Sequence, residues 1–301
     1  MKGKKAIQVS QIVVGLQMLF VAAFILVALF YYSFFSSASN STSNASFNEV
    51  EQYDVVIANG RVIDPETHLD ARKHIGIRDG TIVAISEQPL KSEITIDATD
   101  LVVAPGFIDV HSHSPTILGQ HFNVLDGVTT QLDLEAGSYP VSFYGEHLRA
   151  GAAINYGSSV GHFAVRIKVL EGIDQPYIFA GDKTVVMGSP AWMQEATPEQ
   201  IEQMRLLLHK GLDEGGLGIG VLLDYMTEAV SDAELAMLFD VAGAREVPIY
   251  VHVRRGYTGD PAGLIEVIEL AKSTQAALFV CHISHNAMGR IGDWLTMIDE
   301  A

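Results

Sequence analysis

From Pro105 onward, apolar strand-like segments alternate with helix-like segments, and this alternation restricts the chain to few folds. The predicted strands cover residues 106–113, 128–135, 152–162, 215–223, 247–254 and 277–285. Thr197 and Ser231 begin two of the helix-like segments as polar capping residues. Strands separated by helices in this way predict a parallel sheet covered by helices.

Histidines mark the C-terminal ends of several predicted strands. His111 and His113 stand two positions apart in the first strand, so both side chains point to the same side. His252 and His285 end two later strands. Because barrel enzymes place their sites at these strand ends, the pattern favours a (β/α)8 TIM-type barrel over an open doubly wound sheet. Converging imidazoles predict a metal site there.

The alternation of side chains within a strand also predicts which face the polar residues near these histidines occupy. Asp133 and Glu135 alternate with leucines and are expected to point into the barrel, where acids are costly unless they are paired or bound to metal. Glu135 is the preferred bridge between two ions, and Asp133 is the second choice. Asp109 is expected to orient one of these imidazoles by contacting its ring from outside the metal site. His282 has the opposite parity to His285 and is expected to face outward.

The segment 53–104 has a different pattern of short strands and tight turns. Hairpin turns are predicted at Asn59-Gly60 and at Asp79-Gly80, because both pairs favour the positive φ angles of a type I′ turn. This segment is interpreted as a small β-sandwich module. Residues 105–301 are interpreted as an incomplete barrel, truncated after about six strands.

The N-terminal part is expected to lie outside the fold. An apolar run of 24 residues from Ile12 to Phe35 follows several lysines. Spanning a bilayer takes ~20 apolar residues, whereas the core of a signal peptide takes ~7–15. Residues 1–36 are therefore predicted to be a transmembrane anchor, with cleavage after Ala38 as the alternative. In both cases the rest of the chain lies outside the cytoplasm. Residues 37–52 form a polar linker.

Composition excludes two classes of protein. The net charge of −17 disfavours nucleic-acid binding, because an acidic chain repels phosphate groups. Cys281 is the single cysteine, so neither an intrachain disulfide nor a cysteine-rich zinc module is possible.

Six motifs follow one another along the folded part of the chain. They are APGFIDVHSHS (104–114), GVTT (127–130), INYGSSVGHFAVR (154–166), GGLGIGVLLDY (215–225), YVHVRR (250–255) and HISHN (282–286). In this order they resemble the D-aminoacylase, or N-acyl-D-amino-acid deacylase, branch of the amidohydrolase superfamily. The similarity runs from about Tyr53 to the end of the sequence.

The resemblance implies a centre of one or two divalent ions, with zinc as the preferred metal. His111 and His113 would bind one ion, and His252 and His285 would bind the other. Relatives in this branch usually carry a bridging cysteine just after the second strand. Glu135 occupies that place here, so it is expected to bridge the ions instead.

The resemblance also implies an activity, the hydrolysis of a carbon–nitrogen amide bond by metal-activated water. A small-molecule N-acyl amino acid is the expected substrate, with its configuration left open, and Tyr225 and Arg254 match positions near the substrate. The family's acid/base is an Asp at the end of the eighth strand. We therefore expect no catalytic acid/base within residues 1–301 and an inactive fragment.

Two alternatives stay open. A cyclic-amide hydrolase of dihydroorotase or hydantoinase type shares the HxH strand, although the fourth strand, GGLGIGVLL, lacks the lysine that those enzymes carboxylate. A non-catalytic remnant is the second alternative, if the chain ends at Ala301. The sequence does not predict an oligomeric state.

Overall fold

The structure is a computed structural model. It describes residues 52–113, 115–176, 188–224, 229–255 and 258–301. These divide into two compact units with the boundary between Ala104 and Pro105. The predicted anchor at residues 1–36 and most of the linker lie outside the described residues. Within the described ranges, no helix has the length and apolar character needed to cross a bilayer.

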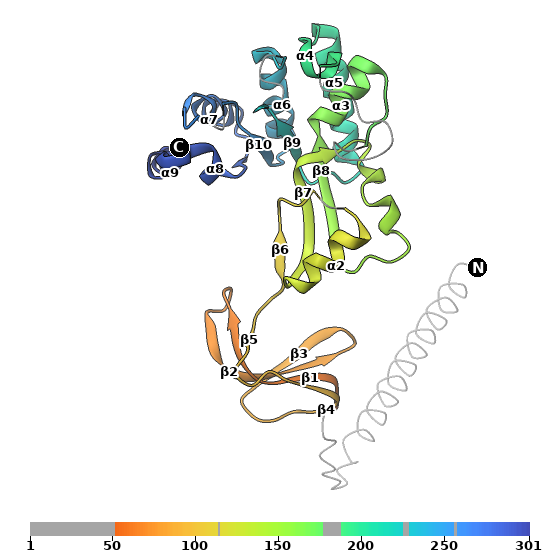
Figure 1. The fold of residues 1–301 in the computed structure, drawn as a ribbon, viewed down its shortest axis with the longest axis vertical. Helices are drawn as coiled ribbons and strands as arrows, with labels where there is room; N and C mark the ends of the chain where they lie inside the picture. Colours follow the sequence, from red (N-terminus) through yellow and green to blue (C-terminus); the bar gives the residue numbers. More distant parts are fainter. Residues whose placement is uncertain (1–51, 114, 177–187, 225–228, 256–257) are drawn as a thin grey trace, which may run out of the picture. The chain divides into compact units, whose positions relative to one another are not determined.

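The first unit is built on one mixed five-stranded sheet in the order β3-β2-β1-β4, with β5 also paired to β1 (Figure 1). Strand β1 is antiparallel to β2 and parallel to β4 and β5. A second, facing sheet, which the sandwich prediction requires, is not found among the residues described for this unit. The strands are β1 (Gln52–Asp64), β2 (Leu69–Arg78), β3 (Thr81–Ser86), β4 (Lys91–Asp97) and β5 (Val102–Val103).

One of the two predicted turns in this unit is confirmed and the other is wrong. Asp79 and Gly80 join β2 to β3 with φ angles of 50° and 70°. Asn59 and Gly60 instead lie inside the continuous strand β1, at an irregularity in its pairing with β2. A Cβ atom at Gly60 would lie 2.5 Å from the Cγ2 atom of Val103. Glycine is therefore required there for the close approach of β5, not for a turn.

The second unit contains a curled parallel sheet in the order β11-β10-β9-β8-β7-β6 (Figure 1). All neighbouring strands pair in parallel. Strands that follow one another in sequence order across a curled sheet are typical of a TIM-type fold. The strands are β6 (Phe107–Asp109), β7 (Val128–Ser138), β8 (Asn155–Gly161), β9 (Ile219–Leu222), β10 (Ile249–His252) and β11 (Leu278–Val280).

Helices connect these strands and pack against the sheet. Helix α5 begins with the predicted cap, because the Thr197 side chain and Gln200 form a reciprocal capping box. Helices α3 and α5, α5 and α6, and α6 and α7 are neighbours, and they enclose a large apolar core. The helices are α2 (Ile117–Leu125), α3 (His162–Glu171), α4 (Pro190–Met193), α5 (Pro198–Asp213), α6 (Asp232–Ala244), α7 (Ala262–Thr274), α8 (Ile283–Ala287) and α9 (Ile291–Asp299).

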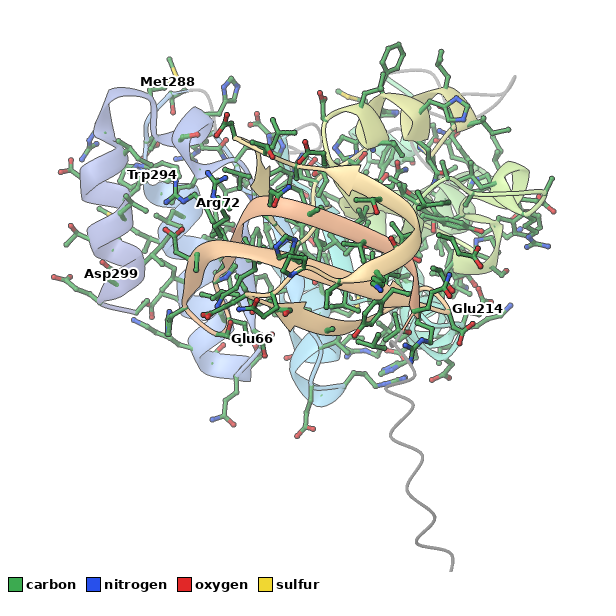
Figure 2. All side chains as sticks on the ribbon, turned by 90° about the horizontal axis from the view of Figure 1, so that it is seen from below. Glu66, Arg72, Glu214, Met288, Trp294 and Asp299 are labelled. Carbon is green, nitrogen blue, oxygen red and sulfur yellow. The ribbon has the colours of Figure 1, made fainter. Side chains whose placement is uncertain are left out.

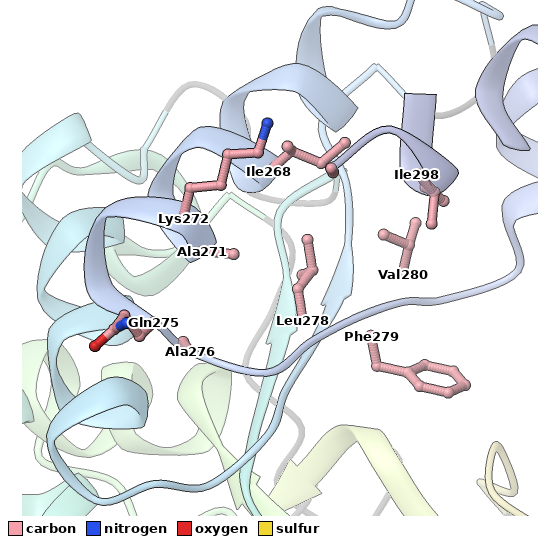
Figure 3. Close-up of a pocket in the computed structure, with 10 residues that line it drawn as sticks. Ile268, Ala271, Lys272, Gln275, Ala276, Leu278, Phe279, Val280 and Ile298 are labelled. Carbon is pink, nitrogen blue, oxygen red and sulfur yellow. The ribbon is translucent and has the colours of Figure 1, made fainter. Parts of the chain in front are cut away.

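The two outer strands of the sheet keep apolar side chains exposed. Phe107 and Ile108 of β6 are 65% and 62% exposed. Beside β11, an apolar pocket of about 600 Å³ lies between this strand, α7 and α9 (Figure 3). Helix α9 buries Trp294 completely while Asp299 is exposed (Figure 2). Both edges of the described sheet therefore offer apolar surface for further packing.

A buried ionic network ties α3 to α6. The Arg166 guanidinium pairs with the Glu234 carboxylate, and His162 Nε2 lies 2.7 Å from Glu234 Oε1. All three side chains are fully buried. Burial alone would raise the pKa of Glu234, but contacts with His162 and Arg166 outweigh it and lower this pKa. The Ser231 side chain accepts from the Glu234 backbone N–H and so caps α6, as predicted.

We predict that Glu234→Ala destabilises the protein by about 3–5 kcal/mol, because it leaves the Arg166 charge buried without its counter-ion. Urea unfolding of the purified variant measures this change. Glu202→Ala is the matched control, since Glu202 forms an exposed helix pair with Arg205 and its loss should cost less than about 1 kcal/mol. Equal effects of the two substitutions would contradict a structural role for the network.

Candidate metal centre

Glu135 is the centre of a cluster of imidazoles at the C-terminal side of the parallel sheet. It lies in β7 between the buried Leu134 and Ala136, and is itself only 3% exposed. Both of its carboxylate oxygens are surrounded by histidine nitrogens. The contacts are His111 Nε2 at 3.3 Å and His113 Nε2 at 3.1 Å from Oε2, and His252 Nδ1 at 3.0 Å and His282 Nε2 at 2.7 Å from Oε1.

Different strands deliver these four imidazoles to the carboxylate. His111 and His113 follow the end of β6, and His111 forms an isolated bridge with Asp133 of β7. His252 is the last residue of β10. His282 follows β11 by two residues. Parallel strands with adjacent C-terminal ends therefore bring together side chains that are far apart in the sequence.

Three of the imidazoles contact Glu135 through one ring nitrogen and an outer oxygen acceptor through the other. Such outer partners fix the tautomer and the orientation of histidines that bind metal. The nitrogens that face Glu135 are thus the ones available to a cation. The outer contacts are His113 Nδ1 with Asp133 Oδ1 at 3.0 Å, His252 Nε2 with Asp224 Oδ2 at 3.3 Å, and His282 Nδ1 with Asn286 Oδ1 at 2.8 Å.

The orienting role predicted for Asp109 is not what the structure shows. Asp109 Oδ1 accepts a hydrogen bond from the backbone N–H of His111 at 3.0 Å. Asp109 therefore fixes the backbone of the HxH segment. The ring of His113 is oriented by Asp133, the residue that was the second choice for a bridging ligand.

The electrostatics of the cluster follow from these contacts. Burial alone would raise the pKa of Glu135, but hydrogen bonds from the surrounding imidazoles hold it far below its usual value. Burial lowers the pKa of His113, but Asp133 and Glu135 outweigh burial and raise it to about 10. Contact with Glu135 also raises the pKa of His282. Without a cation, protonated imidazoles balance the charge of the ionised carboxylates, so a metal ion has to displace protons from the imidazoles and should bind more weakly as the pH falls.

The prediction that His282 faces outward is wrong. Strand β11 ends at Val280, so strand alternation does not extend to residue 282. His282 has a φ of 34° and begins the short helix α8. This turn directs His282 to Glu135, whereas the ring centroid of His285 lies 6.1 Å from that of His282. In the described part of the chain, His285 belongs to neither group of three side chains that could hold an ion.

Two further predicted residues were assigned to the substrate. Tyr225 lies outside the described residues. The Arg254 guanidinium contacts protein groups, with Nε 3.1 Å from Glu266 Oε2 and Nη2 2.7 Å from the Val230 carbonyl oxygen. The contact with Glu266 ties the segment after β10 to α7, and the contact with Val230 ties it to the segment before α6. A role of Arg254 in substrate binding stays a prediction.

Sequence reasoning missed several residues near the cluster. Asp224 lies two residues after the end of β9, the kind of strand end that drew attention to the histidines. Cys281 shares its strand parity with His285 and was given no role. Burial raises the pKa of its thiol, and the charges of Glu135 and Asp133 add to this shift. Among the residues that the structure describes, cation-holding geometry occurs in two groups, His111–Glu135–Cys281 and Glu135–His252–His282, with donor atoms within 4.8 Å of one another.

Comparisons of the sequence agree with this geometry, although no family model matches the chain. A D-aminoacylase from Alcaligenes xylosoxydans xylosoxydans is 26% identical over 277 residues, which cover 81% of this chain and 53% of the relative. An N-acyl-D-glutamate deacylase from the same organism is 29% identical over 83% of this chain and 54% of the relative. The chain thus spans about half the length of the curated relatives it matches. A dihydroorotase from Streptococcus pneumoniae serotype 4 is 48% identical, but over only 20% of this chain.

Comparison with solved structures finds the same kinds of enzyme as the comparison of sequences. The N-acyl-D-glutamate deacylase of Bordetella bronchiseptica, complexed with zinc and a phosphonate inhibitor, has a TM-score of 0.66 and 25% identity, covering 83% of this chain and 56% of that one. A D-aminoacylase with 21% identity and a TM-score of 0.64, covering 82% of this chain and 56% of that one, shares the fold. Over about 81% of its length, this chain is therefore similar in sequence and structure to members of the D-aminoacylase branch of the amidohydrolase superfamily.

Proposed function

We propose that this chain carries the metal-binding part of a zinc-dependent amidohydrolase that cleaves an amide bond with metal-activated water. The observation that carries the proposal is the distribution of four imidazoles over the two oxygens of Glu135. A carboxylate with two imidazole nitrogens at each oxygen has the donor arrangement of a bridge between two cations. The zinc and the intermediate-mimicking inhibitor in the Bordetella deacylase support the same chemistry.

Each residue of the cluster has a defined task in this proposal. His111 and His113 would hold one ion together with Glu135, and His252 and His282 would hold the other together with the same carboxylate. His282 replaces His285 of the sequence-based set. Bound zinc would supply a Lewis acid and lower the pKa of a coordinated water from ~15.7 to ~7. The protein holds the imidazoles of His113, His252 and His282 in one tautomer through their outer partners and excludes bulk water from the buried carboxylate.

The substrate we propose is an N-acyl amino acid, because the two curated relatives matched over most of the chain are named as an aminoacylase and an acyl-glutamate deacylase. Cyclic amides are the second candidate. They are favoured by the 48% identity to a dihydroorotase, which is confined to a segment of 60 residues. An acid/base that transfers a proton to the leaving amine is still required, and its position beyond residue 301 stays a prediction.

We further propose that the curled sheet is part of a closed (β/α)8 barrel. The exposed apolar side chains on β6 and the apolar pocket beside β11 support closure, because further β/α units would cover both. These edges are also the surfaces that an open parallel sheet leaves unpaired.

We predict that His282→Ala weakens zinc binding by at least about tenfold, since the loss of even an outer partner costs about 10- to 100-fold. His285→Ala is the matched control and should bind zinc as the unaltered protein does. Elemental analysis and competition with a chromophoric chelator measure both variants. If His285→Ala lost zinc and His282→Ala retained it, His285 would be the ligand, as predicted from the sequence. The assignment of His282 from the geometry would then be contradicted.

For activity, we predict that the zinc-loaded protein expressed from its own gene releases free amino acid from N-acetyl amino acids of at least one configuration, whereas residues 1–301 alone should be inactive, because we expect no acid/base among them. Treatment with a chelator should abolish turnover, and added zinc should restore it. Dihydroorotate and hydantoins are assayed in parallel. Turnover of cyclic amides alone would favour the second candidate, and turnover that survives complete removal of metal would exclude both.

From the sequence alone, we also propose that residues 1–36 anchor the protein in a membrane, with the catalytic unit outside the cytoplasm. After cell fractionation, the protein should stay in the membrane pellet through an alkaline carbonate wash. A variant that lacks residues 1–36 serves as the control and should appear in the soluble fraction. Release of the unaltered protein by the wash would disprove the anchor.

A further inference from the structure

Cys281 is a buried nucleophilic group that the proposed chemistry leaves unused. It directly follows β11 and is 2% exposed. Its backbone N–H donates to the Val251 carbonyl oxygen at 3.0 Å, which fixes the residue beside β10. The backbone of Cys281 is thus held beside β10, at the rim of the cluster.

The position of the Cys281 sulfur matches that of a metal ligand. Its Sγ atom, a nitrogen of His111 and an oxygen of Glu135 all lie within 4.8 Å of one another. We propose that Cys281 binds, as a thiolate, the ion held by His111 and Glu135. This inference rests on the proposed function, because it assumes a cation at Glu135.

The distances permit this with a small adjustment. Zinc binds sulfur at ~2.3 Å and nitrogen or oxygen at ~2.0–2.2 Å, so tetrahedral donors around one ion lie ~3.6 Å apart. Donors within 4.8 Å of one another therefore need to close by at most about 1.2 Å. Rotation about the side-chain bonds of His111 and Cys281 can supply such a shift without moving the strands.

Ligation changes one bond at sulfur and requires no oxidant. The S–H bond breaks, its electron pair forms the sulfur–metal bond, and the proton leaves to solvent. A thiolate is a soft ligand, so it favours zinc, cobalt or cadmium over magnesium or calcium. The Cys281 side of the centre would therefore select thiophilic cations. This ligand comes from the strand end next to His282, whereas the family's bridging cysteine follows the second strand.

Cobalt(II) chloride is the probe that tests this proposal. The chain has one cysteine, so a thiolate-to-cobalt charge-transfer band in the near ultraviolet has to arise from Cys281. We expect the band in the cobalt-loaded protein and its complete loss in Cys281→Ser, with cobalt at this site bound at least about tenfold more weakly. His111→Ala should weaken the band, whereas His282→Ala, in the other group of ligands, should retain it.

X-ray absorption of the unaltered zinc protein gives a second measurement that does not depend on the folding of any variant. It should show a sulfur neighbour at ~2.3 Å from zinc. Bound metal with neither the band nor the sulfur neighbour would overturn the role of Cys281 and leave the proposed function intact. Failure to bind either cobalt or zinc would overturn both.

Discussion

The burial of the Glu135 carboxylate is the constraint on which the rest of the centre depends. A carboxylate that is almost completely removed from water is strongly disfavoured unless cationic or hydrogen-bonding groups surround it. Here four imidazoles provide that surrounding. The parallel strands have to end near one another to deliver those imidazoles, and the curled sheet satisfies this requirement. The fold and the chemistry of the site are thus linked through one side chain.

Around this carboxylate, the protein arranges its polar groups in two layers. The imidazoles form the inner layer, and Asp133, Asp224 and Asn286 form the outer layer that sets the ring orientations. Asp133 lies within β7, Asp224 lies two residues after β9, and Asn286 lies in α8, so the backbone of strands and of a helix supports this geometry. A cation that enters the inner layer displaces protons and needs little rearrangement of the chain.

Much of this site could be predicted from the sequence wherever regular strands carry the residues. Glu135 and His252 lie within strands, and alternation placed both correctly on the inner side. Alternation failed at His282, because β11 ends at Val280 and the next residues turn sharply into a helix. His285 was chosen because the alternation of side chains along a strand was applied to residues that lie after the end of β11. A single sequence does not show such a turn, because it depends on the packing of α8.

The parts of the fold that could be predicted from the sequence are likewise those that depend on regular local patterns. The parallel β/α order and the turn at Asp79-Gly80 were predictable, since they depend on local patterns. The turn at Asn59-Gly60 was not, because Gly60 serves a contact with Val103 from a distant strand.

The proposal that Glu135 bridges two zinc ions is tested most directly by anomalous diffraction at the zinc edge from crystals of the zinc-loaded protein. The account predicts two zinc peaks, one within ~2.0–2.2 Å of each oxygen of the Glu135 carboxylate. Zinc bound elsewhere, with Glu135 still surrounded only by imidazoles, would contradict it.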